Sequence, residues 1–252
     1  MSTSFLSPGW RMPTNKNQSK SFNYSFTGAG TGWRMPRNAN QSKQSNYSID
    51  FDGSSQYIAI APTTATDMTG YNTIALWVKR AVTGVNHYLF TKRGTGPEYA
   101  FFIETTNLLG FDDGTGSKAY GNTAIPSNVW THVAVVVESG GCVFYVNGVA
   151  DGGAASGISV AASTNTTYIG RKYNGPPQMN GQINEVCFFD YALSPSQVTT
   201  LWGGGTSVSN PMALPSSPIA YYPLGESAGG FVGGSGTWLT ENNAIGDYVF
   251  DF

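Results

Sequence analysis

The sequence predicts an all-β fold, a sandwich of two antiparallel β-sheets with one short helix. Short runs of β-branched and aromatic residues alternate with clusters of turn residues along most of the chain. Glycine accounts for 32 of the 252 residues and charged residues for only 11%, which excludes a coiled coil. The apolar content of 40% is enough to form a core and argues against extensive disorder.

Ten segments carry the strand pattern. Residues 73–79 and 130–138 are nearly continuous apolar runs, as is typical of strands in the middle of a sheet. Asn147 and Gly148 predict a tight hairpin after the strand that precedes them, because both turn positions take a positive φ. The predicted strands are residues 47–51, 57–60, 73–79, 87–91, 99–104, 108–112, 130–138, 142–146, 167–170 and 182–189.

The predicted helix covers residues 193–202. Ser194 is a natural N-cap, Pro195 fits the first helical position, and Gln197 completes a capping box. A run of three glycines at 203–205 ends the helix.

The charges divide the chain into a basic arm and an acidic body. Residues 1–49 hold six basic residues and no acidic ones, whereas residues 50–252 hold seven basic and fifteen acidic residues, a formal charge of −8. A basic arm can bind nucleic acid, an anionic membrane or an acidic protein surface, and it can also be a solubilising tail. The bases are too sparse to favour nucleic acid, so we expect either a protein surface or a solubilising role.

A duplication lies inside the arm. Residues 9–25 and 32–48 match at 13 of 17 positions, and each copy begins with Gly-Trp-Arg-Met-Pro. So short a unit cannot bury its own tryptophan, and we expect it to dock on the body or on another subunit. In the predicted arm, residues 1–45, the anchoring residues are Trp10, Arg11, Trp33 and Arg34.

Six stretches of the body occur in an order that a known family shares. They are SIDFDG at 48–53, TIALWVK at 73–79, WTHVA at 130–134, VFYVNG at 143–148, YIGR at 168–171 and NGQINEV at 180–186. They resemble the laminin-G-like domains of the concanavalin A-like lectin/glucanase superfamily, as found in phage structural proteins. The resemblance implies a jelly-roll sandwich over residues 46–203. It leaves the function open, because this fold hosts lectins, glycosidases, adhesion modules and viral surface proteins.

The last segment, residues 204–252, is predicted to be a linker followed by extra strands. Residues 218–226 resemble the opening strand of such a domain, and residues 246–252 resemble residues 46–51. Either a second copy begins here, or these strands pair with the body or with a neighbouring subunit.

The sequence argues against an enzyme and leaves a metal site open. Glycosidases of the resembled superfamily carry closely alternating carboxylates on one strand. No such pattern occurs here, and Glu185 stands alone on its strand. The resemblance also implies a Ca²⁺ site at the rim, for which Asp112 and Asp113 are the candidates. The alternative is that Asp113 begins a tight turn with Gly114.

A sugar site needs an exposed aromatic ring with polar groups beside it. Trp77 and Trp130 fall within strand patterns and are expected in the core, so the candidates are sought in loops. The alternative for each candidate is an ordinary residue of the rim. The glycan-binding candidates are Tyr120, Tyr173, Arg171, Asn174, His87 and Tyr99. Cys142 and Cys187 lie on predicted strands, where buried thiols are expected and a disulfide is the alternative.

The N-terminus shows no basic stretch followed by an apolar block, and no apolar run is long enough to span a membrane. Laminin-G-like domains act outside cells, yet this N-terminus shows no export signal. A protein that reaches the exterior on a released particle would need no such signal. We predict a non-enzymatic virion surface protein, a capsid decoration, fibre or tail-associated subunit. It would form a homo-oligomer, bind virion subunits through residues 1–45 and 218–252, and display the sandwich toward host glycans. The alternative is a carbohydrate-binding or adhesion module of a longer secreted bacterial protein, located outside the cell or at its surface.

Overall fold

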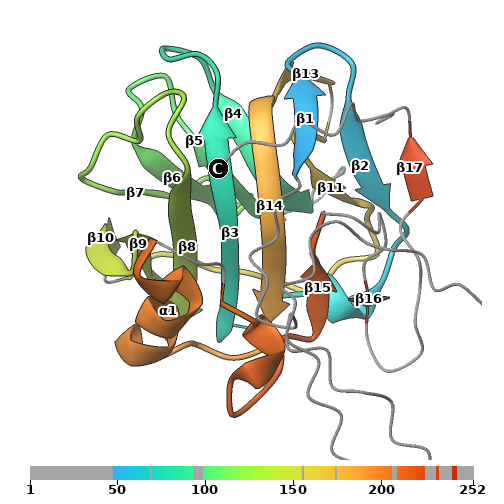
Figure 1. Ribbon diagram of the computed structural model, residues 1–252. Coiled ribbons are helices and arrows are strands. Elements are labelled where there is room, and N and C mark those ends of the chain that lie inside the picture. Colours follow the sequence, from blue (N-terminus) through green and yellow to red (C-terminus); the bar gives the residue numbers. More distant parts are fainter. Residues whose placement is uncertain are drawn as a thin grey trace, which may run out of the picture. The chain divides into compact units, whose positions relative to one another are not determined.

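The computed structural model describes residues 48–68, 70–92, 99–154, 156–173, 175–205, 209–224, 231–232 and 240–242. Within these ranges two antiparallel sheets pack face to face, and a short helix lies on the outside of one of them (Figure 1). The all-β sandwich predicted from the sequence is confirmed. The predicted anchoring residues Trp10, Arg11, Trp33 and Arg34 lie outside the described residues.

Sheet A has the strand order β10-β9-β8-β3-β14-β15-β16, with β1 also paired to β14. Its long central strands come from the two apolar runs and from the Asn-Gly-Gln-Ile-Asn-Glu-Val stretch. Its strands are β1 (Ile49–Asp52), β3 (Asn72–Arg80), β8 (Thr131–Glu138), β9 (Gly141–Val146), β10 (Val149–Ala154), β14 (Asn180–Phe189), β15 (Ala220–Tyr222) and β16 (Phe231–Val232).

Sheet B has the order β17-β2-β11-β4-β5-β6-β7. A separate two-stranded hairpin, β12 (Arg171–Lys172) and β13 (Gly175–Gln178), follows β11 directly. The strands of sheet B are β2 (Tyr57–Ile60), β4 (His87–Lys92), β5 (Tyr99–Ile103), β6 (Leu109–Asp112), β7 (Lys118–Tyr120), β11 (Thr167–Ile169) and β17 (Thr240–Asn242).

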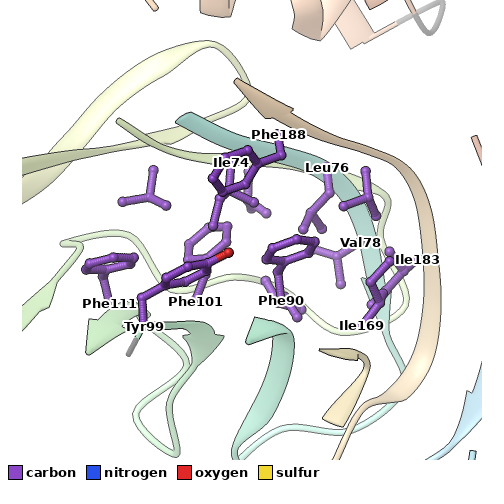
Figure 2. Close-up of a cluster of buried hydrophobic side chains, with 14 of the residues drawn as sticks. Ile74, Leu76, Val78, Phe90, Tyr99, Phe101, Phe111, Ile169, Ile183 and Phe188 are labelled. Atoms are coloured by element: carbon purple, nitrogen blue, oxygen red, sulfur yellow. The ribbon is translucent and has the colours of Figure 1, made fainter. Parts of the chain in front are cut away.

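The main core lies between the two sheets (Figure 2). Ile74 and Leu76 point into it from β3, two residues apart as the pleat of a strand requires. The ring centroid of Tyr99 lies 6.1 Å from that of Phe90 and 6.3 Å from that of Phe111. Burial of one such side chain stabilises the fold by roughly 1.5–3 kcal/mol. This cluster therefore fixes which face of each strand points outward.

The helix α1 (Pro195–Trp202) forms where the sequence predicts it. The Ser194 side chain accepts a hydrogen bond from the Gln197 backbone N–H, and the Gln197 side chain accepts one from the Ser194 N–H. Gly203 ends the helix with a φ of 64°, a conformation that favours glycine. Val198 and Leu201 pack on the outer face of sheet A, in a second and smaller apolar cluster.

Two short strands placed end to end cover the outer edge of β14. β15 pairs with residues 186–188 and β1 with residues 180–183, both antiparallel to β14, so they run in the same direction. Between them β14 is irregular at Glu185, which has a φ of 53° and whose backbone N–H donates to the Pro223 carbonyl. Farther along, β16 pairs with β15, and β17 pairs with β2 in sheet B. These C-terminal strands thus pair with the body of their own chain, one of the alternatives that the sequence left open.

Cys142 and Cys187 are buried free thiols, as expected, and burial raises the pKa of both. Neither has the thiolate character that a reactive cysteine needs. Across the described ranges, no helix combines the length and apolarity that crossing a bilayer requires.

Candidate functional site

The outer face of sheet B, turned away from the core, carries a row of aromatic side chains. Tyr88 of β4, Phe102 of β5, Gly110 of β6 and Tyr120 of β7 are directly opposite one another across the four strands. The rings of Tyr88 and Phe102 stack with centroids 5.3 Å apart and planes inclined by 24°. A Cβ atom at Gly110 would lie 2.6 Å from the Phe102 ring, so the glycine leaves the space that this ring occupies.

The row continues toward β11 and β2 through a cationic side chain. The guanidinium carbon of Arg171 lies 4.2 Å from the ring centroid of Tyr57 and 5.3 Å from that of Tyr168. At these distances a cation is attracted by the electron-rich face of each ring. The two tyrosine rings meet edge to face, with centroids 5.9 Å apart. Arg171 is therefore held against the sheet by two aromatic contacts.

The β12–β13 hairpin supplies this arginine, and the fold fixes the hairpin at its base. Gly170 has a φ of 81°, and a Cβ there would lie 2.6 Å from the Phe51 ring. The hydroxyl of Thr91 on β4 donates to the Arg171 carbonyl at 2.8 Å. Lys172 follows, with its Nζ 5.9 Å from the ring centroid of Tyr88.

A shallow depression joins the row to the hairpin, lined by Tyr88, Thr91, Ala100, Lys172 and Tyr173. We call the set of these outward-facing side chains of sheet B and the hairpin the aromatic face. Its members are Tyr57, Tyr88, Phe102, Tyr120, Tyr168, Arg171, Lys172 and Tyr173.

The structure brings three of the predicted glycan-binding residues together on this face. Tyr120 lies at one end of it, and Arg171 and Tyr173 lie on the hairpin side, all three half-buried. Asn174 lies outside the described residues. Glycan binding by these residues stays a prediction.

The expectation that His87 and Tyr99 lie exposed in loops is wrong. Each is the first residue of a strand of sheet B, at a position whose side chain points inward, and both are buried. His87 Nδ1 accepts from the Asn180 N–H at 3.3 Å and Nε2 donates to the Val82 carbonyl at 3.0 Å; burial lowers the pKa of this imidazole. The Tyr99 hydroxyl donates to the Thr66 carbonyl at 2.7 Å. Both residues stabilise the sandwich from within.

Asp112 and Asp113 make the contacts of turn residues. Asp113 Oδ1 accepts from the Thr115 N–H and Oδ2 from the Ser159 N–H, each at 2.8 Å. Asp112 Oδ1 accepts from the Gly114 N–H at 2.8 Å. These bonds are the ones that the turn alternative requires, and a Ca²⁺ site at these two residues stays a prediction. Nowhere in the described ranges do three or more His, Cys, Asp or Glu residues form a group that could hold a metal ion.

Sequence reasoning missed five members of the aromatic face, because it sought the candidates in loops, whereas these five lie on strands. The alternation of inward and outward positions along each strand could have identified two of them. Tyr57 precedes Ile58, and Tyr168 lies between Thr167 and Ile169, so these tyrosines are out of phase with the core residues beside them. The missed residues are Tyr57, Tyr88, Phe102, Tyr168 and Lys172.

Solved structures of similar fold were found, but no curated protein matches the chain. A Bacteroides ovatus protein assigned to carbohydrate binding is 20% identical with a TM-score of 0.59, over 73% of this chain and 53% of that one. This chain thus spans about half the length of that protein. Domain 4 of AbnA, an extracellular arabinanase of Geobacillus stearothermophilus, is 22% identical with a TM-score of 0.51, over 61% of this chain and 75% of that one. At such identities the likeness shows the fold alone.

The sequence itself gives the family. The family model of the Concanavalin A-like lectin/glucanases superfamily matches residues 52–199, which include both central strands of sheet A and the whole aromatic face. This match covers more than half of the chain, and the protein therefore belongs to the concanavalin A-like lectin/glucanase superfamily, with a laminin-G-like domain.

Proposed function

We propose that the sandwich is a non-enzymatic carbohydrate-binding module whose ligand lies on the aromatic face. The observation that carries the proposal is a row in which two half-buried tyrosines, Tyr88 and Tyr120, flank the buried Phe102 and Gly110. A tyrosine offers a sugar both an apolar ring for its C–H face and a hydroxyl for hydrogen bonding. The depression beside Tyr88 is shallow, which suits a sugar chain lying along a surface better than an enclosed small molecule.

Two structures of similar fold support this proposal by analogy. The Bacteroides ovatus protein is assigned to carbohydrate binding, and domain 4 of AbnA was solved in complex with arabinotriose. The proposal for this chain rests on its own aromatic face, because fold likeness alone does not transfer a ligand.

The non-enzymatic part of the proposal rests on the surroundings of Glu185. This carboxylate accepts a hydrogen bond from the Tyr221 hydroxyl and lines a hollow on the outer face of sheet A with Trp77, His132 and Cys187. Among the described residues that line this hollow, Glu185 is the sole carboxylate, whereas a glycosidase of the usual kind needs two.

A glycan array tests the binding function. The wild-type chain should retain a subset of glycans, and Tyr120→Ala and Tyr88→Ala should each weaken that binding about tenfold, corresponding to about 1.4 kcal/mol. Tyr71→Ala is the matched control, because Tyr71 is 53% exposed and lies next to β3 of sheet A. Circular dichroism checks that each variant folds. Equal loss in all three variants, or no retained glycan, would contradict the proposal.

We also propose that the module is displayed on a virion surface and anchored there by residues 1–45 as a homo-oligomer, without nucleic acid. The duplicated Trp-Arg-Met-Pro units and the acid-free arm support this proposal. A module of a longer secreted bacterial protein is the alternative. Deletion of residues 1–45 should abolish incorporation of the protein into purified particles, as measured by mass spectrometry; undiminished incorporation counts against the anchor.

A further inference from the structure

The aromatic face carries positive charge that no carboxylate of the described residues neutralises. Arg171 and Lys172 are adjacent on β12, in a body whose formal charge from residue 50 onward is −8. Within the described part of the chain, neither residue forms an ion pair. The acidic side chain on the same face, Asp112, lies toward β7, where its Oδ2 is 3.7 Å from Lys118 Nζ.

Arg171 is held in place before any ligand arrives. The two tyrosine rings at 4.2 and 5.3 Å restrict its guanidinium, and the Thr91 hydroxyl restrains its backbone. Its Nε–H is shielded from water without an acceptor in the described residues. A planar guanidinium fixed in this way matches the geometry of a carboxylate or sulfate, which can take two of its N–H donors at once.

Lys172 extends the positive charge to the aromatic row. Its Nζ lies near the Tyr88 ring, and its side chain lines the depression with Tyr88 and Tyr173. A saccharide stacked on Tyr88 would therefore bring its substituents toward both cations. A neutral saccharide would use the rings but leave these cations without a partner.

We infer that the ligand of the aromatic face is an acidic saccharide, whose carboxylate or sulfate groups bind Arg171 and Lys172. This inference rests on the proposed carbohydrate-binding function and names the chemical class of its ligand. The stacked rings hold the sugar, and the two cations select sugars that carry negative charge.

Isothermal titration calorimetry with three tetrasaccharides tests the inference. The probes are an oligogalacturonate, which carries carboxylates, a sulfated carrageenan fragment and a neutral galactan fragment. At least one acidic probe should bind ten times more tightly than the neutral one, and its affinity should fall as salt is raised. The stronger of the two acidic probes identifies the group that Arg171 prefers.

Variants separate the charge from the rings. Arg171→Gln and Lys172→Gln should each weaken acidic-probe binding at least tenfold and weaken neutral-probe binding less. Lys79→Gln, on β3 of the opposite sheet, is the matched control and should bind like wild type. Equal affinity for acidic and neutral probes, or unchanged acidic binding in both variants, overturns the inference alone. Absence of binding to every probe overturns the proposed function and the inference with it.

Discussion

His132 shows how strongly burial on the outer face of sheet A penalises charge on a single residue. It is 2% exposed, its ring meets that of Trp77 edge to face at 5.4 Å, and its Nδ1 has no hydrogen-bond partner within the described residues. Burial lowers the pKa of this imidazole from 6.5 to about 3, because an imidazolium here would lose its hydration. The folded protein therefore keeps His132 neutral at every pH above that value.

The free energy of unfolding should consequently fall as the pH is lowered from 6.5 to 3. Between pH 6.5 and 3 the unfolded chain binds a proton at His132 that the folded chain does not, so each pH unit removes up to about 1.4 kcal/mol of unfolding free energy. His132→Phe keeps a ring beside Trp77 and removes the titration. From pH 7 to pH 4.5, urea unfolding should show a loss smaller by roughly 2–3 kcal/mol in the variant than in wild type. Parallel pH profiles would mean that His132 becomes protonated inside the fold.

Residue roles were the least predictable part of the molecule. His87 and Tyr99 are residue types that often bind ligands at a surface, but at their positions in the strands the side chains point inward and are buried. Tyr57 and Tyr168 are aromatic residues within strands, as core residues often are. Side chains alternate between the two faces of a strand, and at these two positions they point outward. The sequence shows the alternation but not which phase faces the partner sheet, and a one-residue error in phase exchanges core and surface. Tyr120 and Arg171 were found because they lie at strand or hairpin ends.

At the scale of elements, β15 shows how much a short edge strand can contribute. It has three residues, but Ala220 and Tyr222 belong to the main core with exposures of 0%. Leu224, just beyond the strand, is also buried in that core. The contribution of β15 therefore comes from these inward side chains more than from its few backbone hydrogen bonds.

Two substitutions at Tyr222 should separate the ring from its hydroxyl. Tyr222→Ala should lower the free energy of unfolding by about 3–5 kcal/mol, because it leaves a cavity in the core. Tyr222→Phe should be neutral or stabilising by about 1 kcal/mol, because the buried hydroxyl has no hydrogen-bond partner in the described residues. Urea unfolding monitored by tryptophan fluorescence measures both. A comparable loss in the two variants would show that the hydroxyl has a partner after all.

Elements with a strong local signal were predicted well, and those made by tertiary pairing were not. The capping residues located α1, and the apolar runs located β3 and β8. The sequence of β10 is Val-Ala-Asp-Gly-Gly-Ala and that of β13 is Gly-Pro-Pro-Gln, so neither has strand propensity. Each is a strand because a neighbouring strand supplies its hydrogen bonds, a cause outside the local sequence.

At the scale of the whole molecule, the first strand of the described body and one of its late strands share one edge of β14. β15 and β1 follow one another along β14 in the same direction, so residue 224 and residue 48 approach the same part of β14 from opposite sides. Chain order and spatial order differ at this point, which is why residues 218–226 resembled an opening strand in the sequence. Residues 219–222 lie beside β14, although they come after it in the chain.

A circular permutant should therefore fold. It begins at Val85, runs to Leu224, continues through a short Gly-Ser linker to Ser48, and ends at Gly84, in an exposed loop between β3 and β4. We expect the circular dichroism spectrum of the unpermuted 48–224 segment and a melting temperature within about 3 °C of it, a difference of about 1 kcal/mol. Aggregation of the permutant alone would show that β15 and β1 do not form one edge.

The position of β15 also determines when the protein can fold during its synthesis. The ribosome releases β1, β3, β8 and β14 long before residue 224, so the nascent chain holds β14 with half of its outer edge unpaired. The places that Ala220, Tyr222 and Leu224 fill are exposed to solvent during this time. An open strand edge beside an unfilled apolar core is a template for pairing with another nascent chain. Translation speed across residues 190–224 and chaperones that shield strand edges should therefore control the yield of native protein more than events at the start of the chain do.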